Sequence, residues 1–174
     1  MGIGKTFKKF PKTFWVANSI ELFERWAWYG FFMLFANYLT GSSDIGGLEF
    51  SQAEKGHIMG IGTAFLYFLP VLTGSIADKI GYKRVLFLSF IIYTTAFIAL
   101  PMFDSFWGVF AIYLYLAVGA ALFKPVISAT IAKTTTNETS SIGFGIFYMM
   151  VNIGAFIGPL VTLLFIKDNS YDFV

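Results

Sequence analysis

Three ionisable side chains lie inside an otherwise apolar stretch near the start of the chain, IELFERWAWYGFF, and they are Glu21, Glu24 and Arg25. On an α-helix each residue turns by about 100°, so these three side chains and Trp28 fall within one arc, with Tyr29 beside it. Burial raises the pKa of a carboxyl group and a nearby cation lowers it, so carboxyl groups in such a cluster can be poised to bind and release a proton. The spacing therefore predicts a proton-binding stripe on one helix face.

A fourth charge, Lys124, lies deep in a later apolar stretch. Two glutamates and one arginine leave the stripe one negative charge in excess, which Lys124 would neutralise if the two helices touch. A buried ion-pair network that only joins helices is the alternative, but hydrophobic replacements are often as stable as such networks. An ionised side chain at the bilayer centre costs roughly 2.5 to 3.5 kcal/mol on insertion scales. We therefore interpret the four charges as a site that moves ions or a charged solute.

The composition places these charges in a membrane protein. Hydrophobic residues make up 57% of the chain and charged residues only 13%, against roughly 25% charged residues in soluble domains. The absence of cysteine excludes disulfide bonds, thiol chemistry and cysteine-bound zinc. No pattern of metal ligands, no HExxH and no serine elbow is present, so an enzyme is the least favoured class. We expect no cofactor other than protons as the coupling ion, and no nucleic-acid partner.

Hydrophobic segments, each near the roughly 20 residues that cross a bilayer, predict an all-α membrane protein. We predict five spans within residues 14–166, preceded by an N-terminal tail at 1–13. Residues 167–174 are expected to begin an extracytoplasmic connection, and the chain is expected to be the front part of a longer protein. The predicted spans are 14–39, 53–77, 85–103, 106–132 and 142–166.

Basic residues indicate the orientation of these spans, because they remain on the cytoplasmic side of membrane proteins. A cytoplasmic N-terminus leaves only Lys55 and Lys167 on the opposite side. We predict a multi-pass protein of the plasma (inner) membrane with a cytoplasmic N-terminus. The cytoplasmic basic residues would be Lys5, Lys8, Lys9, Lys12, Lys79, Lys83, Arg84 and Lys133.

Two features of the last span each allow two interpretations. Residues 154–158, GAFIG, form a GxxxG pattern, for which close packing of two helices is favoured over a ligand role. Asn152 either bonds across to a neighbouring helix or lines a pocket.

Separate stretches of the chain resemble the signatures of the proton-dependent oligopeptide transporters (POT/PTR family) of the major facilitator superfamily. ELFERWAWYG resembles the first-helix signature of the family, and FYMMVNIGAF its fifth-helix signature. LFKP matches the fourth helix, in which Lys124 is the buried lysine. GSIADKIGYKR is similar to the superfamily's loop motif between helices two and three. That motif supplies Gly74, Asp78, Gly81, Lys83 and Arg84.

The resemblance implies the first five transmembrane helices of a six-helix bundle, whose partner is the missing C-terminal half of the same transporter. It implies that Arg25 and Lys124 receive the carboxylate of a peptide, while Glu21 and Glu24 take part in proton binding. An aromatic wall at Trp28, where the family has tyrosine, leaves the substrate range open. The other implied roles are cavity lining for Tyr29, Tyr67 and Asn152, and a cytoplasmic gate for Gly74, Asp78, Lys83 and Arg84.

These implications favour a proton-coupled symporter that imports di- and tripeptides across the lipid bilayer by alternating access. One alternative is a transporter of the same fold for another small anionic or amino-acid-derived solute. Another is a membrane assembly subunit that does not transport.

Overall fold

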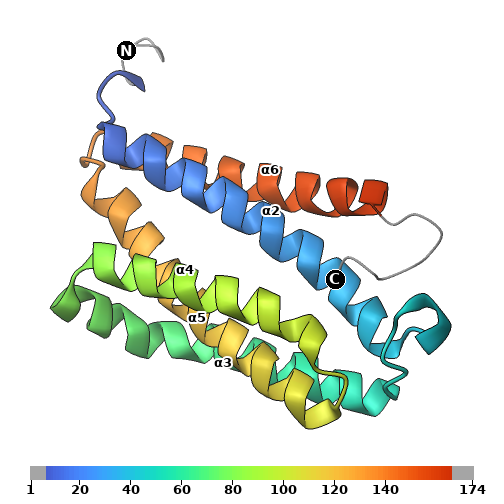
Figure 1. The fold of residues 1–174 in the computed structure, drawn as a ribbon. Helices are drawn as coiled ribbons and strands as arrows, with labels where there is room; N and C mark the ends of the chain where they lie inside the picture. The colour runs from blue at the N-terminus through green and yellow to red at the C-terminus, as the bar shows by residue number, and fades with distance from the viewer. Residues whose placement is uncertain (1–6, 166–174) are drawn as a thin grey trace. The chain divides into compact units, whose positions relative to one another are not determined.

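The computed structural model describes residues 7–165, and this part of the chain is helical with no strand. Short connections join its long helices, as Figure 1 shows. The long helices are α2 (Lys12–Thr40), α3 (Gln52–Ile80), α4 (Tyr82–Ala99), α5 (Phe106–Lys133) and α6 (Ser140–Phe165), and the 3₁₀ turns are η1 (Ser43–Ile45) and η2 (Leu100–Met102). Each predicted span corresponds to one of these helices, so the predicted all-α fold class is confirmed.

The helix boundaries differ from the predicted spans at a few positions. Helix α4 ends at Ala99 rather than near residue 103, and the chain tightens into η2, which contains Pro101. Proline lacks the N–H that a continuing helix needs and disfavours helical backbone at the residue before it. The predicted connection at 167–174 and residues 1–6 of the predicted tail lie outside the described residues.

Within residues 7–165, four helices are long and apolar enough to cross a membrane. They are α3, α4 continued through η2, α5 and α6. Helix α2 has 29 residues, more than the roughly 20 that a crossing needs. Helix α2 is therefore not one of these four because of its charged residues, not because of its length.

The chain packs as two compact units, and the division between them falls inside α2 and inside α5. Residues 34–126 contain the end of α2, all of α3 and α4, and most of α5. Residues 7–33 and 127–165 contain most of α2, the end of α5, and α6.

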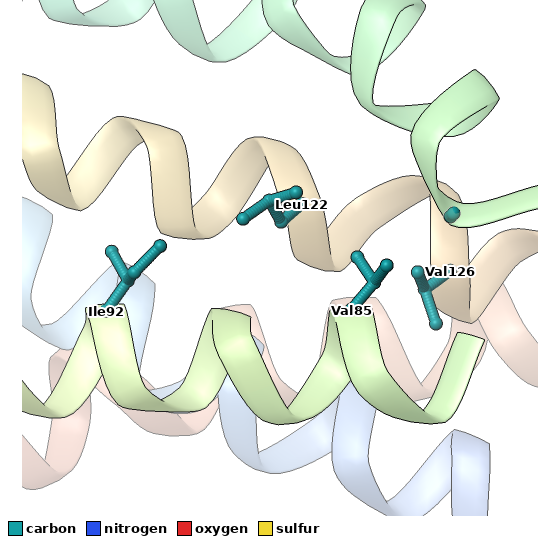
Figure 2. Packing of buried hydrophobic residues seen from close by; sticks show 5 residues of the cluster. Val85, Ile92, Leu122 and Val126 are labelled. Carbon is teal, nitrogen blue, oxygen red and sulfur yellow. The ribbon is translucent and has the colours of Figure 1, made fainter. Parts of the chain in front are cut away.

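Helices α3, α4 and α5 share a buried apolar cluster within residues 34–126. Figure 2 shows Val85 and Ile92 of α4 opposite Leu122 and Val126 of α5, and Ala77 of α3 completes the cluster. Because lipid tails are as apolar as these side chains, close van der Waals contact stabilises the cluster more than exclusion of water does.

Local capping residues set both ends of α3. At its start, Ser51 and Glu54 form a capping box, in which each side chain accepts a hydrogen bond from the other residue's backbone N–H. At its end Gly81 has φ +95°, a conformation that side chains other than glycine rarely adopt. Gly81 is also the residue before α4, so a single glycine produces the reversal between the two helices.

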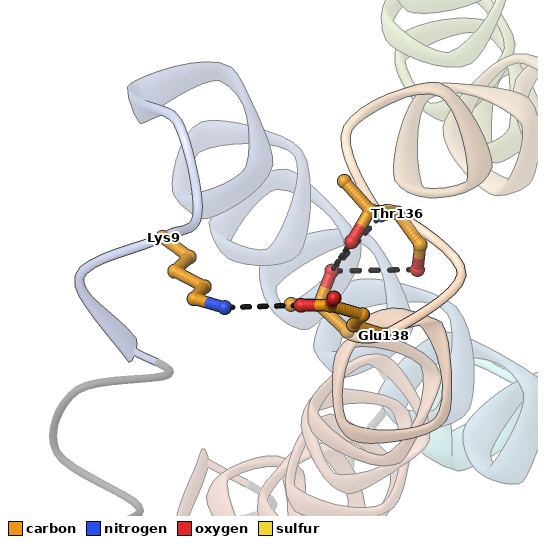
Figure 3. Close-up of polar contacts among 4 residues, drawn as sticks. Lys9, Thr136 and Glu138 are labelled. Carbon is orange, nitrogen blue, oxygen red and sulfur yellow. Dashed lines mark hydrogen bonds and ion pairs between the residues drawn. The ribbon is translucent and has the colours of Figure 1, made fainter. Parts of the chain in front are cut away.

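The N-terminal segment contacts the connection between α5 and α6. Lys9 Nζ lies 3.2 Å from Glu138 Oε2, and the Thr136 amide donates to Thr139 Oγ1 at 2.9 Å (Figure 3). Both members of the ion pair are exposed, so we expect it to contribute at most about 1 kcal/mol.

Helix α6 packs against α2 through its glycines, which confirms the close packing predicted from GAFIG. A Cβ at Gly154 would lie 2.6 Å from the Leu22 carbonyl oxygen and 2.8 Å from Arg25 Cβ. A Cβ at Gly158 would lie 2.5 Å from the Trp26 carbonyl oxygen. Backbone atoms cannot move aside as a flexible side chain does, so these two positions require glycine.

We expect Gly154→Ala to lower the free energy of unfolding by about 1 to 3 kcal/mol, the usual cost of overpacking a close contact. Gly145→Ala, on the same helix, is the matched control, because a Cβ at Gly145 would meet no other atom within 4 Å. Thermal melting of the two variants in detergent measures the difference. Equal melting temperatures would contradict the close contact between α2 and α6.

Candidate functional site

The predicted proton-binding residues form one contact cluster on α2. Arg25 Nε and Nη2 donate to the two carboxylate oxygens of Glu24 at 2.5 and 2.6 Å, a two-bond fork. Arg25 Nε also lies 3.4 Å from Glu21 Oε1. The exposed fractions are 5% for Glu21, 9% for Glu24 and 5% for Arg25, so all three groups are nearly fully buried. One guanidinium thus contacts two carboxylates, and it holds Glu24 more closely than Glu21.

The packing of α6 fixes the helix face that carries this cluster. Gly154 lies directly against the Cβ of Arg25, so the backbone of α6 covers the root of that side chain. A larger residue at position 154 would collide with Arg25 Cβ and displace the arginine side chain, so its guanidinium would no longer reach the carboxylates. The close contact between the helices therefore also positions Arg25.

Asn18 is a buried polar residue near the cluster that the sequence analysis did not single out. Its side chain is 1% exposed, and its Nδ2 donates to the Phe14 carbonyl at 2.9 Å. Within the described residues its Oδ1 is buried without a hydrogen-bond partner. Asn18 precedes Glu21 by three residues, so both side chains project from the same helix face. The signal for Asn18 in the sequence was its position, one helical turn before Glu21 in an otherwise apolar stretch.

Two aromatic residues next to the cluster have different surroundings. Tyr29 is exposed, and its ring centre lies 5.9 Å from Arg25 Cζ, within cation–π range. Trp28 is buried, and its ring stacks on Phe32 at 6.4 Å between ring centres. Of these two aromatic residues, Tyr29 is the one with a solvent-accessible ring.

Lys124 belongs to the unit formed by residues 34–126, where it pairs with Tyr67. Its Nζ lies 5.5 Å from the centre of the Tyr67 ring, which is 69% exposed. A lysine over an aromatic face gains roughly 0.5 to 2 kcal/mol, more when water is excluded. The predicted meeting of Lys124 with the α2 cluster stays a prediction.

Asn152 lies in an open groove along α6. The groove has a volume of about 660 Å³ and is mostly apolar, and the exposed side chain of Asn152 supplies one of its polar groups. The choice between the pocket role and a bond between helices stays open for Asn152. The groove is lined by Gly145, Tyr148, Met149, Asn152, Ile153, Phe156 and Ile157.

The residues of the predicted gate lie around the reversal at Gly81. Asp78 Oδ1 accepts a hydrogen bond from the Tyr82 hydroxyl at 2.8 Å, a partner that the motif had not indicated. Lys83 and Arg84 are exposed in the first turn of α4. Farther along α3, a Cβ at Gly74 would lie 3.7 Å from Pro125 Cβ. The gate role of these residues stays a prediction.

Comparisons with known proteins show the family to which the chain belongs. Residues 17–173 match the family model described as Major Facilitator Superfamily. The chain is 32% identical over 172 residues to the dipeptide and tripeptide permease A of Proteus mirabilis, covering 94% of this chain and 33% of that protein.

Two solved structures are also similar to the chain. One is a peptide transporter POT in complex with sulfate, with a TM-score of 0.79 and 28% identity over 87% of this chain and 31% of the other. The second is a POT family transporter in complex with 5-aminolevulinic acid, with a TM-score of 0.82 and 27% identity over 89% of this chain and 32% of the other. The chain thus spans about a third of the length of these relatives. The resemblance to peptide transporters predicted from the motifs is confirmed.

Proposed function

This chain belongs to the Major Facilitator Superfamily, and we propose that the protein containing it is a proton-coupled symporter that imports di- and tripeptides by alternating access. The four apolar helices and the superfamily membership make it an integral membrane protein. The proposal places it in the plasma membrane with a cytoplasmic N-terminus.

The observation that carries the proposal is the buried cluster of Glu21, Glu24 and Arg25. Glu24 is held by two short bonds to Arg25, whereas Glu21 makes the longer contact of 3.4 Å. Arg25 thus holds Glu21 less closely than Glu24, and we assign Glu21 as the proton acceptor. A protonated carboxyl group becomes a hydrogen-bond donor. The buried Oδ1 of Asn18, one turn earlier on the same face, supports this assignment because it is an acceptor in need of a donor.

Substrate binding is assigned to the two cations and their neighbouring tyrosines. Arg25 and Lys124 would attract the carboxylate of a peptide, and each has an exposed tyrosine ring beside it, at 5.9 Å for Tyr29 and 5.5 Å for Tyr67. Protonation of Glu21 weakens its hold on Arg25 and favours the substrate carboxylate there. Proton binding and peptide binding then assist each other, as thermodynamic linkage requires.

A second candidate cargo is a small amino-acid-derived solute. The relative in complex with 5-aminolevulinic acid supports it, because that ligand has a carboxylate and an amine, the two charged ends that a short peptide also presents. Competition between the two ligands separates these candidates.

The full-length protein in proteoliposomes tests the proposal. We expect uptake of labelled dialanine to rise when the outside is made more acidic than the inside, and to fall when a protonophore dissipates the gradient. Excess unlabelled dialanine should inhibit this uptake more strongly than excess 5-aminolevulinic acid does. Dialanine uptake that does not respond to the gradient would overturn proton coupling, and stronger inhibition by 5-aminolevulinic acid would favour the second cargo.

A further inference from the structure

A proline follows Lys124 directly in α5, and it leaves one backbone carbonyl without its helical donor. In an α-helix the N–H of each residue donates to the carbonyl four residues earlier, and proline has no N–H. Pro125 lies inside α5, so the carbonyl of Ala121 lacks that bond. An unpaired carbonyl in an apolar interior costs free energy comparable to a lost hydrogen bond. The turn that carries Lys124 therefore needs a donor from elsewhere.

Helix α3 supplies that donor. Thr73 Oγ1 donates to the Ala121 carbonyl oxygen at 2.6 Å, and Thr73 is 7% exposed. The neighbouring Gly74 lies beside the proline, and a Cβ there would be in ordinary van der Waals contact with Pro125 Cβ at 3.7 Å. This part of α3 thus packs directly on the proline turn, and Thr73 supplies the hydroxyl for the freed carbonyl.

A second side chain, that of Ser89, also donates a hydrogen bond to a backbone carbonyl of α5, but this carbonyl lacks no helical donor. Ser89 Oγ of α4 donates to the Gly119 carbonyl at 2.8 Å. Four residues after Gly119 is Phe123, which has an N–H, so this carbonyl also has its helical donor. The bond from Ser89 joins two helices, whereas the bond from Thr73 also replaces a missing one.

We propose that Thr73 is a positioning residue for Lys124: its hydroxyl closes the turn opened by Pro125 and so sets where the ammonium group lies. Two contacts between α3 and α5 depend on this turn, the Thr73 bond to Ala121 and the Tyr67 ring beside Lys124. Without the hydroxyl, the turn would rotate to find another donor for the carbonyl, and Lys124 would move away from Tyr67. The functional consequence rests on the proposed role of Lys124 in binding the substrate carboxylate.

Threonine variants of the full-length protein test the inference by dialanine uptake in proteoliposomes. Thr73→Val keeps the shape and removes the donor, and we expect KM to rise about fivefold, the factor for one lost hydrogen bond of average strength, with a smaller change in maximal rate. Thr73→Ser keeps the donor and should restore KM to within about twofold, given the same bond. Ser89→Ala is the matched control, expected to lower the melting temperature and leave KM unchanged.

Two double variants test whether Thr73→Val acts through the proline turn and through Lys124. In a Pro125→Ala background the residue at 125 regains its N–H, so Thr73→Val should change the melting temperature much less than it does beside proline. In a Lys124→Gln background Thr73→Val should raise KM no further, because the group that it positions is gone. Equal effects of Thr73→Val with and without Pro125, or an additive rise of KM with Lys124→Gln, would overturn the inference.

A readout without transport separates this inference from the proposed function. Mass spectrometry can follow the rate at which a water-soluble amine reagent modifies Lys124. We expect Thr73→Val to change this rate several-fold, and Thr73→Ser and Ser89→Ala to leave it unchanged. If the unmutated protein takes up no dialanine, the proposed function fails, and the labelling and melting results still decide the role of Thr73. Equal labelling rates in Thr73→Val and the unmutated protein would overturn it.

Discussion

Replacing Glu21 by glutamine is expected to reduce gradient-driven dialanine uptake to the level of protein-free liposomes. Glutamine keeps the size of the side chain and can still accept a hydrogen bond, but it cannot bind or release the coupling proton. Glu24 cannot easily take over this role, because two bonds of 2.5 and 2.6 Å join it to Arg25. Uptake under an inward proton gradient, with the outside acidic, is the measurement.

Exchange of labelled for unlabelled dialanine without a gradient is the internal control for this variant. Exchange needs binding and alternating access but no net proton movement, so we expect Glu21→Gln to retain it. Glu138→Gln is the matched control variant, since Glu138 is exposed and forms an ion pair with the exposed Lys9, away from the α2 cluster (Figure 3). Normal gradient-driven uptake by Glu21→Gln would show that another group carries the proton.

Replacing Arg25 by methionine is expected to have the largest effect on stability. It leaves Glu21 and Glu24 buried without the guanidinium that contacts both, and loss of one partner from a buried ion pair costs about 3 to 5 kcal/mol. Arg25→Lys should lose less, because a lysine keeps the charge but not the two-bond fork. Unfolding by denaturant in detergent micelles measures both variants.

Arg84→Met is the matched control for this loss, because Arg84 is exposed at the start of α4 and should change the free energy of unfolding by about 0.5 kcal/mol or less. A compensating variant probes the cause. Combining Arg25→Met with Glu24→Gln removes one of the carboxylates that lose the guanidinium and should recover part of the lost stability. If the double variant is no more stable than Arg25→Met, the loss of the guanidinium from Glu24 is not the reason for the lower stability.

The helices and the charged stripe were predictable from the sequence because they depend on local rules. Apolar runs of about 20 residues indicate spans, and each predicted span is one helix of the structure. The spacing of Glu21, Glu24 and Arg25 places them on one face through the helical repeat alone, and the structure brings all three into contact. The α-helical part of α4 ends at Ala99, but the apolar span continues through η2 to Met102, close to the predicted end at residue 103.

Contacts between distant segments were decided by the tertiary structure. Thr73 and Ala121 lie 48 residues apart, and no periodicity within either helix indicates that the hydroxyl of one meets the freed carbonyl of the other. Arg25 lies closer to Glu24 than to Glu21, and this difference likewise depends on the side-chain conformation of Arg25. Gly154 of α6 packs against the Cβ of Arg25 and so restricts that conformation. The sequence by itself determined which residues share a helix face, since the 3.6-residue repeat acts within one segment. Only the packing of helices against one another determined which of those faces meet, because that packing depends on shape and hydrogen bonding across the whole chain.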